Sequence, residues 1–147
     1  MRQAALALLT MLLLAACGGG GGSSRLSKSE FEAKANDICD KYLGEVDAVP
    51  APKEIKDVPA YIDKVLPLIE EATSKLDDLQ PPKDIEPTVD EWIRLQRKQV
   101  DQGKQLKAAA EKGDTATAAK VVNEGNATNK RGNELAKEMG ATSCGQD

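Results

Sequence analysis

Apolar and polar residues alternate along this chain with the period of an α-helix in four successive segments. In each segment apolar residues recur every three or four positions, a pattern typical of helices that bury one face. Proline or glycine interrupts the pattern between segments, and no stretch alternates with the period of a strand. We therefore expect an all-α fold, a four-helix up-down-up-down bundle. The predicted helices run from Ser27 to before Pro50, from Asp57 to Leu79, from about Asp84 to Lys112, and from Thr115 to about Met139.

The ends of these helices carry sequence signals. Ser27 followed by Glu30 is a capping box, in which each side chain accepts a hydrogen bond from the other residue's backbone N–H. Gly113 is expected to end the third helix, and Asp114 to cap the start of the fourth. Gly140 is expected to end the fourth.

The first residues predict export and a lipid anchor. Arg2 precedes an apolar run that ends at Ala16 and is too short to span a bilayer, since a spanning helix needs about 17–25 residues. Leu14-Ala15-Ala16-Cys17 resembles the lipobox of bacterial lipoproteins, which implies acylation of the Cys17 thiol and cleavage before it. Gly18 to Ser24 then forms a flexible tether. The alternative is a soluble secreted protein in which Cys17 is incidental.

These predictions divide the chain into three parts. Residues 1–16 are a lipoprotein signal peptide, residues 17–25 the lipidated cysteine with its Gly/Ser tether, and residues 26–147 the helical bundle. The expected location is extracytoplasmic, with the protein lipid-anchored to the bacterial cell membrane or envelope.

Charge and aromatic content argue against nucleic acid as a partner. The chain has 20 Lys and Arg against 24 Asp and Glu, a net charge of −4. Binding of nucleic acid depends on clustered positive charge and, for single strands, on aromatic side chains that stack on bases. Only four aromatic residues are present. We therefore expect no nucleic-acid partner.

Two cysteines remain once Cys17 is lipidated. An exported protein meets an oxidising compartment, so Cys39 and Cys144 are expected to form a disulfide, with two free buried thiols as the alternative. Cys39 lies about 12 residues into the first helix, roughly 18 Å from its start. Cys144 follows the last helix. Either the first helix overhangs the bundle, or the C-terminal tail folds back along that helix.

Two short motifs carry a resemblance to a family. The first predicted helix contains Ala35-Asn36-Asp37-Ile38-Cys39, and the last runs from Leu135 through Gly140 to Cys144-Gly145. This pairing resembles small helical lipoproteins of actinobacteria. The resemblance implies an exported, disulfide-closed helical domain and carries no catalytic residues to transfer. The last helix of that family commonly ends in a Leu-Gly-Leu-like turn, where this chain has Met139-Gly140-Ala141.

The chain contains no histidine, which removes several kinds of active site. Ser-His-Asp triads, most zinc sites and the Glu-x-x-His ligands of di-iron bundles all need that residue. Tyrosine can ligate haem, but Tyr42 and Tyr61 lie at or beside apolar stripes, which favours core or rim tyrosines. Adjacent carboxylates such as Glu70 and Glu71 point about 100° apart on a helix and indicate solvated faces. We expect a non-catalytic protein with no cofactor and no metal.

One polar face of the fourth predicted helix is the candidate ligand site. Asparagine is a mediocre helix former, yet three asparagines share this face. An inward-pointing face needs hydrogen-bond partners, which glutamines of the third helix or a ligand would supply. We therefore consider a polar groove between the third and fourth helices, and the alternative is a face exposed to solvent. The candidate residues are Trp92, Gln96, Gln99, Asn126, Asn129 and Asn133.

Two functions follow from these observations. The first is a membrane-anchored extracytoplasmic helical lipoprotein that acts as a non-catalytic binding or interaction module. Its expected partners are the membrane, through the anchor at Cys17, and an envelope protein. The alternative is a small-molecule carrier that holds a polar ligand in the groove between the third and fourth helices.

Overall fold

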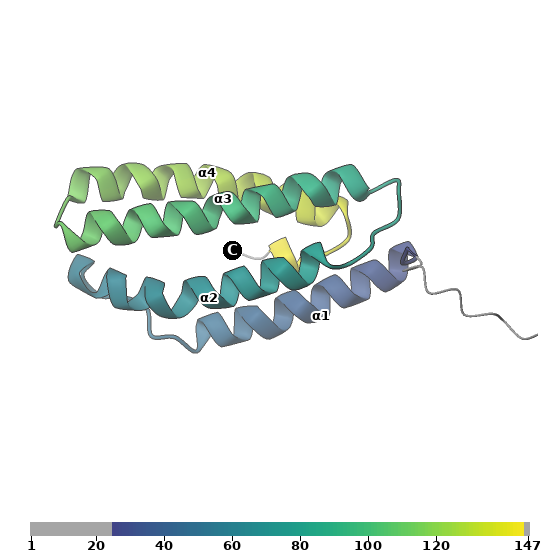
Figure 1. The fold of residues 1–147 in the computed structure, drawn as a ribbon, viewed down its shortest axis with the longest axis horizontal. Helices are drawn as coiled ribbons and strands as arrows, with labels where there is room; N and C mark the ends of the chain where they lie inside the picture. Colours follow the sequence, from purple (N-terminus) through teal and green to yellow (C-terminus); the bar gives the residue numbers. More distant parts are fainter. Residues whose placement is uncertain (1–24, 146–147) are drawn as a thin grey trace, which may run out of the picture.

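The computed structural model describes residues 25–145, and this part of the chain is all-α, as the sequence predicts. Figure 1 shows its four long helices. No strand occurs within residues 25–145. The predictions for the signal peptide, Cys17 and the glycine-rich tether concern residues 1–24 and lie outside the described residues. The elements are α1 (Lys28–Asp47), the 3-10 helix η1 (Ile55–Asp57), α2 (Val58–Asp77), α3 (Glu86–Glu111), α4 (Thr115–Glu138) and the 3-10 helix η2 (Thr142–Gly145).

Helices α1 and α4 begin at the caps that the sequence indicates. Ser27 Oγ accepts from the backbone N–H of Glu30 at 3.3 Å, and the Glu30 carboxylate accepts from the N–H of Ser27 at 2.9 Å. Asp114 accepts from the N–H of Thr117 at 2.9 Å. The Ser27 hydroxyl also donates to the Glu30 carboxylate at 2.6 Å, and this hydrogen bond, followed by the one from the Ser27 N–H, lowers the pKa of Glu30. The hydrogen bond from the N–H of Thr117 is the main reason that the pKa of Asp114 is lowered. Before Asp114, Gly113 has a positive φ of 65°, which favours glycine and ends α3.

Helices that follow one another in the chain pack together. Helix α1 contacts α2, α2 contacts α3, and α3 contacts α4. The short helix η2 contacts both α4 and α1, so the end of the chain joins the last helix to the first. Figure 1 shows this yellow segment lying between the two pairs of long helices.

The C-terminal tail folds back along α1, which decides between the two arrangements considered from the sequence. Gly140, with a φ of 78°, turns the chain after α4, and Asn36 Nδ2 donates to its carbonyl oxygen at 3.3 Å. The other end of the same amide, Asn36 Oδ1, accepts from the N–H of Ser143 at 2.8 Å. Cys39 and Cys144 are thereby brought to disulfide distance, with Cα atoms 5.1 Å apart. The predicted pairing of Cys39 with Cys144 is therefore confirmed as a pair of cysteines at disulfide distance.

The apolar faces of the helices pack together in one core, and Trp92 is part of it. Trp92 packs close to Gly132 of α4, where an added Cβ would lie 4.0 Å from its Nε1. Gly125 of the same helix makes no such contact, since an added Cβ there would meet nothing within 4 Å. The largest fully buried side chains of the described residues are Phe31, Leu135 and Met139.

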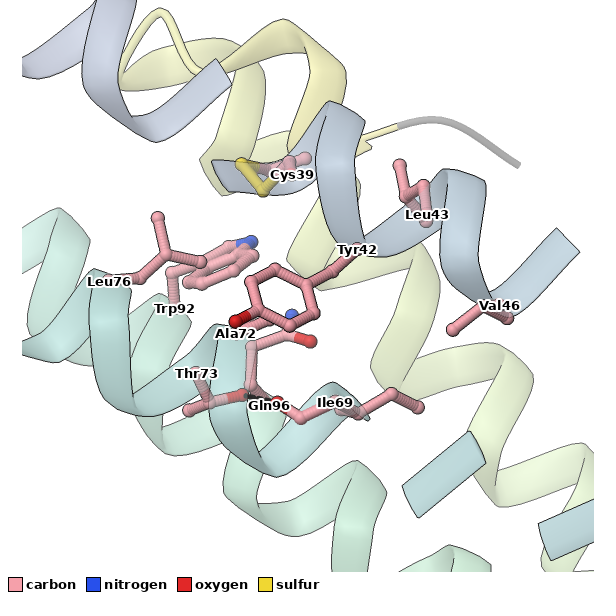
Figure 2. Close-up of a pocket in the computed structure, with 11 residues that line it drawn as sticks. Cys39, Tyr42, Leu43, Val46, Ile69, Ala72, Thr73, Leu76, Trp92 and Gln96 are labelled. Atoms are coloured by element: carbon pink, nitrogen blue, oxygen red, sulfur yellow. Dashed lines mark hydrogen bonds between the residues drawn. A yellow bond between two sulfur atoms is a disulfide. The ribbon is translucent and has the colours of Figure 1, made fainter. Parts of the chain in front are cut away.

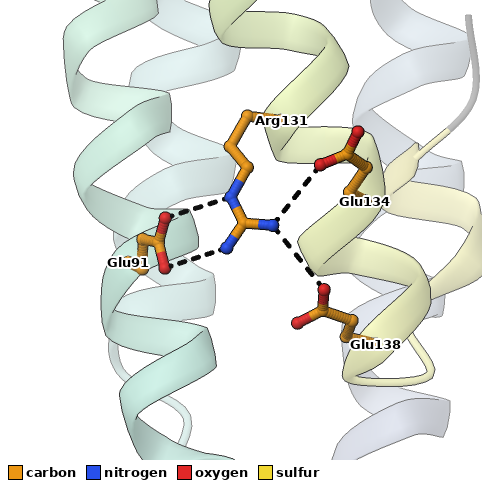
Figure 3. Close-up of polar contacts among 4 residues, drawn as sticks. All are labelled: Glu91, Arg131, Glu134 and Glu138. Atoms are coloured by element: carbon orange, nitrogen blue, oxygen red, sulfur yellow. Dashed lines mark hydrogen bonds and ion pairs between the residues drawn. The ribbon is translucent and has the colours of Figure 1, made fainter.

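An ion-pair cluster connects α3 and α4 on the outer surface (Figure 3). Nε and Nη2 of Arg131 donate to the two carboxylate oxygens of Glu91 at 3.2 and 3.3 Å. Nη1 of Arg131 also lies 3.4 Å from Glu134 and 3.6 Å from Glu138. The hydrogen bond to Glu91 is the main cause of a raised pKa for Arg131. All four side chains are partly exposed, so the cluster contributes little to stability. The two-point contact between Arg131 and Glu91 is directional, and its main effect is to fix the register of α3 against α4.

Candidate functional site

A small pocket lies beside the Cys39–Cys144 pair, where α1, α2 and α3 meet (Figure 2). Its volume is about 90 Å³. Both cysteines line it, as do Trp92 and Gln96 of α3. The tail contacts the middle of α1, through Asn36 and Cys39, and the last turns of that helix extend beyond it.

The walls of the pocket are mostly apolar. Leu43 and Val46 come from the last turns of α1, and Ile69 and Ala72 face them from α2. Leu43 is 37% exposed, so it lies at the rim. Thr73 also lines the pocket, but its hydroxyl donates to the carbonyl oxygen of Ile69 at 2.7 Å and is already satisfied.

One buried polar atom of the pocket has no partner. Trp92 is only 4% exposed, and its Nε1 makes no hydrogen bond to any described residue. Figure 2 shows the indole ring of Trp92 beside Cys39 and Tyr42, but its nitrogen is inaccessible to solvent, so the N–H does not open into the pocket. Nε2 of Gln96 lies close by, since a Cβ at Gly132 would be within 3.5 Å of it and 4.0 Å of Nε1 of Trp92. Nε1 of Trp92 and Nε2 of Gln96 therefore lie together near Gly132 of α4, which is not among the residues that line the pocket.

Tyr42 lies across the pocket from Trp92, and its hydroxyl is engaged. It donates to Oε1 of Glu71 at 2.5 Å. Desolvation and this hydrogen bond raise the pKa of Tyr42 to about 12, while the same bond is the main reason that the pKa of Glu71 is lowered. The ammonium of Lys41 lies 4.5 Å from the centre of the Tyr42 ring. Near neutral pH the pair is therefore a neutral phenol donating to a charged carboxylate.

The six candidate residues do not form one groove between α3 and α4, and this prediction is corrected. Trp92 and Gln96 line the pocket between α1, α2 and α3 instead. Nε2 of Gln99 donates to Oδ1 of Asn129 at 3.3 Å. These two amides satisfy each other across the α3–α4 interface, so they close the space in which the groove was expected.

The three asparagines are placed unequally. Asn126 is exposed, Asn129 is partly buried, and Asn133 is 8% exposed. They line a separate open hollow of about 550 Å³ on α4, together with Lys130 and charged neighbours of the same helix. The alternative of a solvent-facing stripe is therefore correct for Asn126 and wrong for Asn133.

The residues of α1 and α2 that wall the pocket are absent from the sequence-based candidates. Their only sequence signal is that Val46 and Ile69 are apolar positions of predicted helices. Both remain partly exposed in the structure.

Gln102 is a second buried polar group, located on α3 outside the pocket lining. It is 6% exposed, and neither Oε1 nor Nε2 has a hydrogen-bond partner among the described residues. The sequence places it in a row of glutamines but gives no sign that it alone is buried.

Residues 25–145 contain no group of three or more metal-ligating side chains. Within the same residues, no helix combines the length and apolar character needed to cross a bilayer. Comparisons with protein-family models, with characterised proteins and with solved structures found no match to this chain.

Proposed function

We propose that this protein is a lipid-anchored extracytoplasmic lipoprotein that acts as a non-catalytic binding or interaction module. The observation that carries the proposal is the proximity of Cys39 and Cys144, whose Cα atoms lie 5.1 Å apart. A disulfide that holds the chain end is typical of oxidising compartments. Export agrees with the apolar run of residues 1–16 and with the lipobox-like sequence that ends at Cys17. The resemblance to small helical actinobacterial lipoproteins belongs to the same proposal.

In this proposal the helices form an up-down-up-down bundle behind a cleaved signal peptide and a flexible tether. Contacts between successive helices and the short connections that join them support that order. An envelope protein is the expected partner of the interaction module.

Carriage of a small molecule is the second candidate function. The pocket beside Trp92 favours it, because this hollow of about 90 Å³ between three helices has mostly apolar walls. This pocket replaces the groove between α3 and α4 as the site of that candidate.

The anchor is tested by Cys17→Ala expressed in a bacterial host, with Ser24→Ala in the tether as the matched control. Metabolic labelling with a fatty-acid analogue should mark the wild type and Ser24→Ala but not Cys17→Ala, which should leave the membrane fraction or remain unprocessed. Equal labelling of Cys17→Ala would refute the lipid anchor.

The two candidate functions are separated by native mass spectrometry of protein purified from its host. A copurifying mass that is lost on denaturation favours the carrier. Absence of such a mass, with one partner recovered by crosslinking on cells and lost in the soluble Cys17→Ala form, favours the interaction module.

A further inference from the structure

The short helix η2 fills the space between α1 and α4. It contacts both of these helices, whereas α1 packs on α2 and α4 packs on α3. Figure 1 shows η2 between the two pairs of long helices. Its end lies close against α4, since a Cβ added at Gly145 would be 3.1 Å from the Cβ of Ala136. The position of η2 therefore determines whether this space is closed.

The turn that precedes η2 is held in place by α4 itself. The N–H of Gly140 donates to the carbonyl oxygen of Lys137 at 3.2 Å, and the N–H of Ala141 donates to that of Ala136 at 2.9 Å. These two hydrogen bonds form the Schellman motif that commonly ends a helix. Ala141 has no exposed surface. The chain is therefore fixed as far as Ala141 without help from the disulfide.

Two links hold η2 itself to α1. One is the hydrogen bond from the N–H of Ser143 to Oδ1 of Asn36 at 2.8 Å, and the other is the Cys39–Cys144 disulfide. Sγ of Cys144 also lies 3.5 Å from the carbonyl oxygen of Ala35, but a disulfide sulfur has no hydrogen to donate. None of the four residues of η2 is buried. One hydrogen bond offsets much less than the conformational entropy lost when four residues are ordered, so the disulfide keeps η2 in place.

The disulfide is accessible in the folded protein. Both cysteines line the pocket of about 90 Å³, where Figure 2 shows the bond between their sulfurs. Cys144 is partly exposed, whereas Cys39 is 7% exposed. Thiol–disulfide exchange proceeds by attack of a thiolate on one sulfur, and the choice of sulfur depends on access. Sγ of Cys144 is therefore the sulfur that an incoming thiolate reaches first.

We propose that the Cys39–Cys144 disulfide is a reversible link, opened by a dithiol reductant that attacks Sγ of Cys144. A thiolate of the reductant bonds to this sulfur, the bond to Cys39 breaks, and Cys39 leaves as a thiolate that takes up a proton. The second thiolate of the reductant then attacks the reductant's first sulfur, so that Cys144 leaves and is protonated in turn. Two electrons and two protons pass to the protein, and the dithiol becomes a disulfide.

Reduction releases η2 and removes Cys144 from the wall of the pocket. Ala35 of α1 and Ala136 of α4 have no exposed surface in the oxidised protein, and both lie beside η2. Their exposure extends the apolar pocket into a groove between α1 and α4. The inference goes beyond the proposed binding role, because it makes this groove depend on reduction. It needs the disulfide but not the lipid anchor.

Exchange with small thiols tests the site of attack on the purified full-length protein. Alkylation of an unfolded, unreduced sample should label neither Cys39 nor Cys144, which establishes the disulfide. A folded sample is alkylated to block any free thiol, Cys17 included, and is then exposed to 2-mercaptoethanol and quenched in acid. Peptide mapping should place the mixed disulfide on Cys144 and not on Cys39. Reduction by dithiothreitol should proceed at a rate that low concentrations of urea do not change, since only η2 has to move.

Hydrogen exchange and fluorescence test the release of η2. The N–H of Cys144 donates to the carbonyl oxygen of Ala141 at 2.9 Å and should exchange at least about 10-fold faster after reduction, while the N–H of Ala141 stays protected. Trp92 is the single tryptophan and lines the pocket with Cys144, so its emission should shift to longer wavelength as water enters. Oxidised Asn36→Ala is the matched control. It loses the hydrogen bond to Ser143, keeps the disulfide and should show neither change.

The possible failures separate this inference from the proposed function. Labelling of Cys39 and Cys144 in the unfolded, unreduced sample would overturn both the link and the argument for export that the pair carries. With the disulfide present, the link alone is overturned by an adduct on Cys39, by a reduction rate that rises with urea, or by unchanged exchange at Cys144. Loss of the helices on reduction, seen by circular dichroism, would also overturn it, because release should stop at Ala141.

Discussion

Replacement of Gln102 by methionine should stabilise the protein. Gln102 lies on α3 with 6% of its surface exposed, and both ends of its amide lack a partner among the described residues. Methionine has a similar length and volume and nearly the same helix propensity, so the substitution removes the polar atoms with little other change.

The expected gain follows from the cost of burying unpaired polar groups. Each such group costs about 1–3 kcal/mol. Gln102→Met removes one donor group and one acceptor, together about 2–6 kcal/mol. The flexible thioether fills most of the same space, but its imperfect packing offsets about half of this gain. We expect the free energy of unfolding to rise by about 1–3 kcal/mol, which corresponds to a rise of roughly 3–10 °C in melting temperature for a domain of this size.

Urea denaturation followed by circular dichroism measures this change, with Gln99→Met as the matched control. Gln99 lies one turn earlier on α3 and donates to Asn129 at 3.3 Å, so its replacement removes a hydrogen bond and should bring no gain. A fall in the unfolding free energy of Gln102→Met, or equal effects of both substitutions, would refute the reasoning. The amide of Gln102 would then have partners that stabilise it.

Three other contacts give further predictions. Replacing both Cys39 and Cys144 by serine removes a link between positions 105 residues apart and should cost about 4–5 kcal/mol in urea denaturation; a loss below about 1 kcal/mol would contradict the pairing. The pKa of Tyr42 is raised from 10.0 to about 12 in the folded protein. The stability linked to this shift is therefore fully present below pH 10.0 and is lost as the pH rises to about 12. Tyr42→Phe should remove that part of the alkaline stability profile and return the lowered pKa of Glu71 toward its ordinary value, whereas an unchanged profile would refute the assignment. Arg131→Lys keeps the charge but loses the forked contact, so the melting temperature should fall slightly at low salt and not in about 1 M salt; a fall that persists would indicate lost packing.

Local sequence signals predict the helices well because each acts over a few residues. The capping box at Ser27, the cap at Asp114 and the glycine at position 113 depend on hydrogen bonds or dihedral angles of adjacent residues, and all three are confirmed. The course of the tail is different. It depends on Asn36, whose amide bonds two backbone groups more than 100 residues away, and no local pattern distinguishes such an asparagine from a solvated one.

The candidate site was predicted only in part for the same reason. Helical spacing shows that Asn126, Asn129 and Asn133 share a face, but not which helix that face meets. The structure pairs Asn129 with Gln99 and leaves Asn126 exposed, while Trp92 and Gln96 line a pocket with residues of α1 and α2. Whether a buried polar side chain finds a hydrogen-bond partner depends on the exact rotation of each helix about its axis. Periodicity in the sequence shows which residues share a face, but it does not determine that rotation.

The bond between α1 and the tail also determines how the domain would respond to a pulling force. Cys39 and Cys144 close a covalent ring across 105 positions of the chain. Force applied at the two ends can therefore unwind only the first turns of α1, from Lys28 to Cys39, and the short tail after the ring. At a gain of about 2 Å per residue between helix and extended chain, α1 lengthens by only about 20 Å. A single-molecule stretching trace should show one short step under oxidising conditions and, after reduction, a step of several hundred ångströms.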